Sequence, residues 1–369
     1  DFTFENEKKF KLKLSEAIYN PTSLTEGRVF SRNLIWTNTA DFQKRYGNHR
    51  IAGVIGMEAI QNQDNYLGAS VNNFFRTDPL FRNIDNSVTE DIKNIGASGI
   101  TTEWALLSYF AQANYSFGNK YVLGATIRRD GSSRFGSENR WGVFPAISGA
   151  WIISNEKFFQ PLDFFSTFKL RASWGKLGNQ EIGNYPYSSL IGVGQYVYSF
   201  GGNVVTGAQL QQMGNNKIKW ESSTQYDFGI DFSLFNERLA VMIDYYNKTS
   251  NDVLVRVPIP QTGGDQIPPY VNAASIENKG LELSVILNNK YREINYSIGA
   301  NVSTLKNQVL SLSGGEPILG GFGLSDGAIT KTEVGYPVGS FFLYESMGIF
   351  QSQEEIDQAP YQTKDTRPG

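Results

Sequence analysis

Hydrophobic and polar residues alternate along much of this chain, and the alternation predicts long antiparallel strands. Within residues 221–234, one parity holds Tyr226, Phe228, Ile230, Phe232 and Leu234, and the other holds Asp227, Gly229, Asp231 and Ser233. Neighbouring side chains of a strand point to opposite faces, so such a strand has one apolar face and one polar face. Residues 168–175, 281–288 and 294–303 repeat the pattern.

The length of these segments indicates what the apolar face contacts. The chain divides into about ten segments, most of roughly 10 to 15 residues. Strands of globular proteins are usually about 5–6 residues long, whereas a tilted crossing of a bilayer takes about 9–11. Alternation alone fits any half-buried antiparallel sheet. The length favours an all-β fold, a transmembrane antiparallel β-barrel.

The connections between the segments alternate between short and long, which supports the same fold. Three joints are short, namely Gly118 to Lys120, Asn236-Glu237 and Asn289 to Tyr291. The long connections are residues 63–102, 130–140, 177–219, 251–275 and 307–340. Outer-membrane barrels have short periplasmic turns and long extracellular loops. We therefore expect the long connections outside the cell, with 63–102, the least periodic part, as a long excursion.

The composition is compatible with a barrel, and the aromatic residues predict where its wall meets the membrane surfaces. Mean hydropathy is -0.33, 19% of residues are charged, and no apolar run is long enough for a membrane helix. Aromatic side chains of outer-membrane barrels gather in two belts. The candidates are Trp104, Trp141, Trp174 and Trp220 at the long connections, and Phe117, Tyr121, Phe235 and Tyr291 at the short ones. Aromatics also favour strand ends in any β-protein.

The residue inventory gives no support for catalysis, a metal site or nucleic-acid binding. The chain has no cysteine, one histidine (His49, next to a short turn) and a net charge of -3 without a basic stripe. It has no Gly-x-Ser-x-Gly motif. Oxygens of Asp130 and Glu138 suggest a cation loop, but Gly, Asp and Ser also suit a tight turn there. We expect no enzyme, no catalytic residue, no cofactor and no resident metal.

Six stretches, most of them long, resemble the SusC/RagA family of TonB-dependent outer-membrane transporters. They are RRDGSSRFGSENRWGVFPAISGAWIIS (128–154), NEKFF (155–159), FKLRASWGKLGNQEIGNYPY (168–187), WESSTQYDFGIDFSLFNERLAVMIDYYNKTSNDVLV (220–255), VNAASIENKGLELSV (271–285) and GYPVGSFFLYESMGIFQSQEEID (335–357). They cover most of residues 100–360 in the family's order. The first hundred residues match weakly but keep the hairpin pattern.

The resemblance implies a multi-pass barrel of about 22 strands in the cell outer membrane, closed by a plug domain. It implies import of glycans or oligopeptides with a SusD-like surface lipoprotein, powered through TonB-ExbB-ExbD. The chain shows no recognisable plug, TonB box or final aromatic strand, so we interpret residues 1–369 as one region of the barrel. The alternative is a surface β-protein that binds glycans without transport.

Two sets of residues are candidates for contact with a substrate. The loop 177–219 carries aromatic side chains that could stack on sugar rings or pack on one another: Tyr185, Tyr187, Tyr196, Tyr198 and Phe200. The polar strand faces supply residues that would line the lumen: Lys169, Arg171, Asp227, Asp231 and Glu282. The proline-rich segment 251–275 is a candidate docking edge for the lipoprotein. Residues 353–358 are expected to form a short helix.

Overall fold

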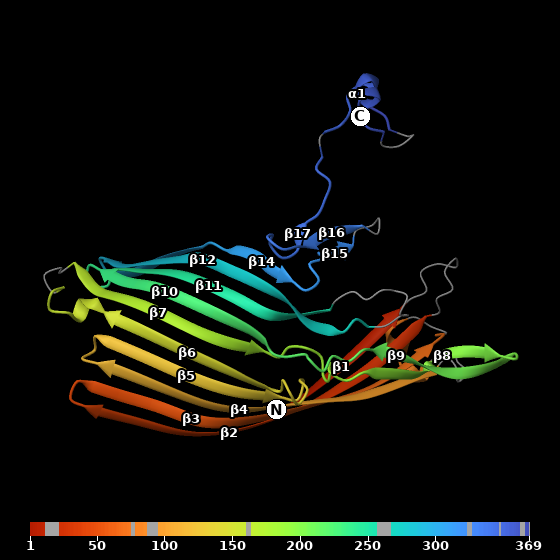
Figure 1. Cartoon of the computed structure of the whole chain (residues 1–369), viewed down its shortest axis with the longest axis horizontal. Coiled ribbons are helices and arrows are strands. Elements are labelled where there is room, and N and C mark those ends of the chain that lie inside the picture. The colour runs from red at the N-terminus through yellow and green to blue at the C-terminus, as the bar shows by residue number, and fades with distance from the viewer. Residues whose placement is uncertain are drawn as a thin grey trace.

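A single large antiparallel sheet dominates the computed structural model (Figure 1). The structure describes residues 1–11, 22–74, 78–86, 95–159, 164–256, 267–322, 327–346, 348–361 and 366–368. No helix in these ranges is long and apolar enough to cross a membrane.

The strands of this sheet follow one another in chain order, apart from one inserted hairpin. They are β1 (Phe2–Lys11), β2 (Ser23–Tyr46), β3 (His49–Asn72), β4 (Ile95–Phe117), β5 (Tyr121–Ser132), β6 (Trp141–Ile152), β7 (Phe165–Asn179), β10 (Glu221–Leu234), β11 (Leu239–Arg256), β12 (Tyr270–Tyr291), β13 (Ile294–Ser303) and β14 (Lys306–Leu312). Each strand pairs with the next, except that β7 pairs with β10 and β14 pairs with β12. This meander is the topology that the alternating connections predict.

The remaining strands lie toward the end of the sheet that carries the long connections. β8 (Leu190–Phe200) and β9 (Asn203–Gln212) form a hairpin that projects beyond the sheet (Figure 1). A small sheet contains β15 (Ile318–Phe322), β16 (Ala328–Thr332) and β17 (Ser340–Phe341). The helices are η1 (Pro79–Phe81), η2 (Ile84–Asn86), η4 (Ile153–Asn155) and α1 (Gln353–Gln358). The prediction of a short helix at 353–358 is confirmed.

Several strands are longer than a membrane requires, and the sequence did not predict this. β2 and β3 have 24 residues each, whereas β5 and β6 have 12. At about 3.3 Å per residue, β3 is roughly 80 Å long. The predicted excursion at 63–102 was therefore wrong at both ends, because β3 continues to Asn72 and pairs with β4 as far as Ile95. Outside the membrane neither face has to contact lipid, so the ladder continues without the alternation.

The other long connections also contain more strand than predicted. The segment 177–219 holds the β8–β9 hairpin, and 307–340 holds β14, β15 and β16. In the segment 251–275, β11 runs on to Arg256 and β12 begins at Tyr270. The two central prolines of that segment, Pro258 and Pro260, lie outside the described residues.

β13 and β14 together occupy one place in the sheet, because both pair with β12. The break between them lies at Thr304, whose backbone NH donates to the carbonyl of Leu281 at 2.8 Å. Gly280 is required opposite the break, since a Cβ there would lie 1.9 Å from the carbonyl oxygen of Thr304. The two strands therefore form one kinked crossing.

The register joins the apolar faces of neighbouring strands into one surface. Ala172, Phe228, Tyr245 and Leu281 lie side by side on β7, β10, β11 and β12. This surface is exposed even where the side chains are large: Phe228 is 55% exposed and Leu281 54%. The polar residues share the opposite face, where Ser108, Ser132 and Ser233 are buried. The apolar side of each hairpin is thus turned outward, as the sequence predicts for lipid contact.

The predicted aromatic belts are only partly correct. At the short turns, Phe117, Tyr121, Trp151 and Phe158 form a continuous row, with ring centroids 6.5, 6.3 and 6.4 Å apart in turn. Phe235 is exposed at its turn, and the side chain of Tyr291 lies outside the described residues. This is the arrangement expected of a periplasmic girdle.

At the other end, two of the four predicted tryptophans belong to a belt. Trp141 and Trp174 lie on the apolar face, and Trp141 stacks on Tyr109 at 6.2 Å. Trp104 and Trp220 were predicted wrongly. Trp104 lies on the polar face under the guanidinium of Arg134, at 4.8 Å, and Trp220 is buried among the outer loops. Their positions near strand ends do not distinguish lipid contact from contact with a loop.

Candidate functional site

Four of the five residues predicted to line the lumen meet in one ion-pair network on the polar face. Arg171 of β7 makes two hydrogen bonds to the carboxylate of Asp231 on β10, at 2.8 and 2.7 Å. Lys169 adds a third, at 3.0 Å. Arg171 also reaches Asp244 of β11 at 3.1 Å and approaches Asp227 to 4.0 Å. Bidentate contacts between guanidinium and carboxylate fix both side chains in orientation.

A glycine makes this network possible. Gly229 lies between Arg171 and Asp244 in the register of the three strands. A Cβ on Gly229 would lie 2.4 Å from a carboxylate oxygen of Asp244 and 2.5 Å from Cζ of Arg171. The guanidinium therefore crosses β10 through the space that a side chain at position 229 would fill. The network carries three carboxylates and two cations, so its net charge is -1.

A second network lies farther toward the long connections, on β3, β4 and β5. The guanidinium of Arg128 donates to Asp130 at 2.8 Å, to Glu58 at 3.0 Å and to the hydroxyl of Ser108 at 2.8 Å. Asp130 therefore pairs with an internal cation. Within the described ranges, no three His, Cys, Asp or Glu side chains come close enough together to hold a metal ion.

Between the two networks, the polar face has a hollow of about 250 Å³ that is lined mainly by uncharged groups. Amides and hydroxyls line it, from Gln112, Asn114, Thr126, Ser148, Ser173 and Gln225. Such groups both donate and accept hydrogen bonds. They suit the hydroxyls of a sugar or the amides of a peptide equally well.

The outer end of the polar face is covered by a compact core of loop residues. Phe135, from the β5–β6 connection, and Ile218, from the segment before β10, are fully buried and pack with Trp220. The indole NH of Trp220 donates to the carbonyl of Arg140 at 3.0 Å, which ties the two connections together. These loops are therefore held in a defined shape at the mouth.

The structure divides the predicted aromatic set into two groups. Tyr185 and Tyr187 pack edge to face at 6.2 Å, and the hydroxyl of Tyr185 donates to the carbonyl of Glu103. Tyr198 and Phe200 lie on the projecting hairpin, 53% and 67% exposed. The side chain of Tyr196 lies outside the described residues. A role of the five in binding substrate stays a prediction.

Two further residues occupy the places that the sequence suggested. Glu282 of β12 lies beside Asp244 in the register and extends the polar face. His49 begins β3 at a short turn, with its ring Nδ1 2.8 Å from the hydroxyl of Tyr115 and its ring centroid 4.8 Å from that of Phe117. His49 is thus part of the aromatic girdle at the periplasmic end.

The sequence analysis missed several residues that lie on the polar face but that no local sequence pattern singles out. Glu58 and Arg128 form the second network, and Gln112 and Asn114 line the hollow. Parity alone could have placed them on the polar face. Which of these side chains contact one another depends on the register between strands, and no local sequence pattern predicts that register.

The fold and the two faces can now be compared with known proteins. The family model described as "TonB dependent receptor-like, beta-barrel" matches residues 1–337. The chain belongs to this family. It is therefore a β-barrel section of an outer-membrane receptor, and the predicted fold class and location are confirmed.

Relatives of this receptor section support the SusC/RagA resemblance. It is 38% identical over 274 residues to TonB-dependent receptor P39 of Formosa agariphila, covering 73% of the chain and 25% of that protein. It is 33% identical to TonB-dependent receptor SusC of Bacteroides thetaiotaomicron, covering 70% and 27%. The RagAB peptide transporter superposes with a TM-score of 0.81 at 28% identity, covering 95% and 38%. The chain thus spans about a quarter of the length of these curated relatives.

Proposed function

We propose that the full-length protein is a TonB-dependent nutrient importer of the SusC type. It takes up glycans or oligopeptides across the outer membrane together with a SusD-like surface lipoprotein. The observation that carries the proposal is the sheet with two unlike faces. One face is apolar and exposed on consecutive strands, and the other bears ion pairs and amides that water and polar solutes wet. The similarity to SusC and to the RagAB peptide transporter supports it.

The edges of the sheet support a larger barrel. In the described ranges, β13 pairs on one side only, with β12, and residues 34–46 of β2 pair only with β3. Edge strands with free NH and C=O groups are not stable in a hydrocarbon core. Further strands of the same barrel would pair with both edges. A plug and its TonB contact would belong to other parts of the protein.

The alternative function, a surface protein that binds glycans without transport, is disfavoured by the apolar face. Such a protein would cover Phe228, Ile298 and similar side chains with a second layer, because an apolar patch of this size promotes aggregation in water. These side chains are 55% and 61% exposed. Lipid is the environment in which this exposure is stable.

Uptake by cells tests the function directly. Cells that produce the full-length protein should take up labelled glycan or oligopeptide, and removal of TonB should abolish that uptake. A tagged protein should copurify a lipoprotein from detergent-solubilised membranes. Recovery of the protein in the aqueous phase without detergent, or uptake that is independent of TonB, would contradict the proposal.

Variants of the projecting hairpin test the predicted aromatic set. The double change Tyr198→Ala and Phe200→Ala should lower uptake at least fivefold if these rings bind substrate. Val204→Ala is the matched control, because Val204 is exposed on the same hairpin and offers no ring. Both variants should reach the outer membrane in equal amounts. Equal uptake by the two would remove these rings from the binding site.

A further inference from the structure

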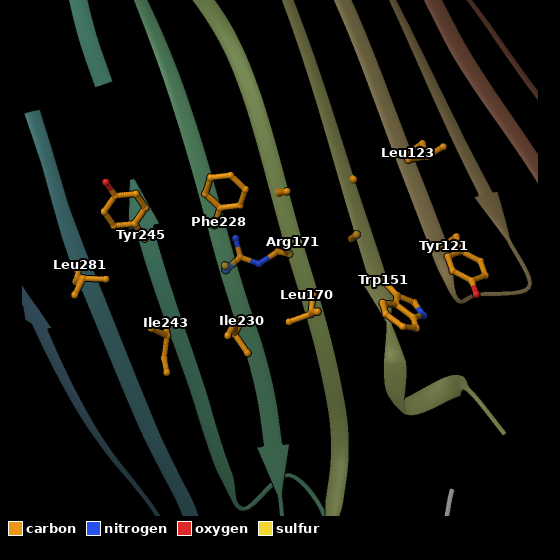
Figure 2. Close-up of a pocket in the computed structure, with 14 residues that line it drawn as sticks. Tyr121, Leu123, Trp151, Leu170, Arg171, Phe228, Ile230, Ile243, Tyr245 and Leu281 are labelled. Carbon is orange, nitrogen blue, oxygen red and sulfur yellow. The ribbon is translucent and has the colours of Figure 1, made fainter. Parts of the chain in front are cut away.

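A large hollow lies on the lipid-facing surface, opposite the polar face. It has a volume of about 810 Å³ and is lined by residues of β5, β6, β7, β10, β11 and β12. Figure 2 shows large side chains in two groups, one around Leu123 and Trp151 and the other around Phe228 and Tyr245. We call this hollow the outer groove.

The register explains why the outer groove exists. Gly149 of β6 and Ala172 of β7 are direct partners, so two small residues lie side by side and form its floor. Leu123 lies next to Gly149 on β5, and Phe228 lies next to Ala172 on β10. Trp151 and Leu170 form the adjacent row toward the short turns. The result is a mainly apolar hollow with small residues in the middle and bulky side chains on both sides.

The groove reaches the periplasmic girdle, where charged and polar groups replace the apolar walls. The carboxylate of Glu156 accepts hydrogen bonds from Lys120 at 2.7 Å, from the hydroxyl of Tyr121 at 2.7 Å and from the indole NH of Trp151 at 3.3 Å. Tyr121 and Trp151 also line the groove. Lys157, the next residue along the chain after Glu156, is exposed. The two lysines and Glu156 leave a net charge of +1 at this end.

We propose that the outer groove holds one acyl chain of a glycerophospholipid from the periplasmic leaflet, with its phosphate beside Lys157. The chain's family places this face in the bilayer, so hydrocarbon is what reaches the groove. A flexible acyl chain fills an irregular apolar hollow, and the cationic end matches an anionic headgroup at the depth of the girdle. The proposal rests on the membrane location and is independent of the imported substrate.

Filling the groove tests the proposal. Ala172→Phe places a ring on the floor, while Ala113→Phe makes the same change at an exposed site of the lipid-facing surface of β4, outside the groove. The full-length protein and both variants are purified from outer membranes in mild detergent, and retained phospholipid is counted by native mass spectrometry. We expect one phospholipid per chain on the original protein and on A113F, and at least fivefold lower occupancy on A172F.

The headgroup assignment has its own comparison. After exchange into vesicles that contain phosphatidylglycerol, Lys157→Glu should lower its retention at least threefold, and Lys290→Glu, at another short turn, should not. Equal retention by these two variants would refute the phosphate site. Equal phospholipid on A172F and A113F, or none on the original protein, would refute the acyl-chain site. A dimer in light scattering that A172F alone disrupts would also refute it, because a second copy would then cover the groove.

Discussion

A charge placed on β12 measures which face of the sheet meets lipid. Leu283 is 40% exposed on the apolar face, and Ser284 is its neighbour on the polar face. Asn289 pairs with Tyr296 near the short turn. At about 3.3 Å per residue and a tilt of about 45°, the stretch from Asn289 up to Leu283 rises roughly 14 Å. Leu283 therefore lies near the middle of an apolar band about 25 Å tall.

We expect Leu283→Arg to lower the free energy of unfolding by about 2–4 kcal/mol, the cost of arginine near the midplane of a barrel. Ser284→Arg should cost less than about 1 kcal/mol, because a polar lumen hydrates the charge. The measurement is urea unfolding of the full-length protein in phospholipid vesicles, followed by tryptophan fluorescence. Equal costs for the two variants, or a larger cost at Ser284, would refute the assignment of the faces.

Three further changes test particular contacts. Gly229→Ala should destabilise the protein by about 1–3 kcal/mol, because its methyl group would displace Arg171 or Asp244, whereas Gly299→Ala, with nothing within 4 Å, should be near neutral in the same unfolding assay. Phe135→Ala should lower the opening free energy of the outer loops by about 3–5 kcal/mol, seen as faster amide exchange around Trp220 while exchange at the short turns is unchanged. Hydrogen bonds from Lys120, Tyr121 and Trp151 hold the pKa of Glu156 below its usual range. The ionised carboxylate therefore stabilises the fold at neutral pH, and this stabilisation is lost as the pH falls through and below that range. The free energy of unfolding measured against pH should show the loss, and Glu156→Gln should abolish this pH dependence.

The two faces and the order of the strands could be predicted because both depend on residues that are close together in the sequence. The parity of Phe228, Ile230 and Phe232 states which side is apolar, and turns such as Gly118 to Lys120 state where the chain reverses. Eight residues of the apolar parity in β7 and β10 proved to be direct neighbours, in four pairs. The same alternation recurs on several strands, and its length together with the alternating connections indicates lipid contact.

The sequence failed where a second segment decides the environment. Trp220 is near a strand end, as a belt residue would be, but the loop around Phe135 covers it. The aromatic set of the 177–219 loop was grouped by proximity in the chain, and the hairpin separated Tyr198 from Tyr185. The ion-pair network needed Gly229, whose role depends on a neighbour from another strand.

The part of β3 and β4 that continues beyond the membrane has a consequence for how the protein tolerates substitution. From Gln63 to Val71, β3 pairs with β4 through backbone hydrogen bonds, and neither face of the two strands has to contact lipid. The main substitution that these strands cannot accept there is proline, which lacks the NH group that the ladder needs. Closer to the periplasm, one face of each strand carries mainly apolar residues. We therefore expect substitutions to be tolerated more readily in this extension of β3 and β4 than in the wall below it.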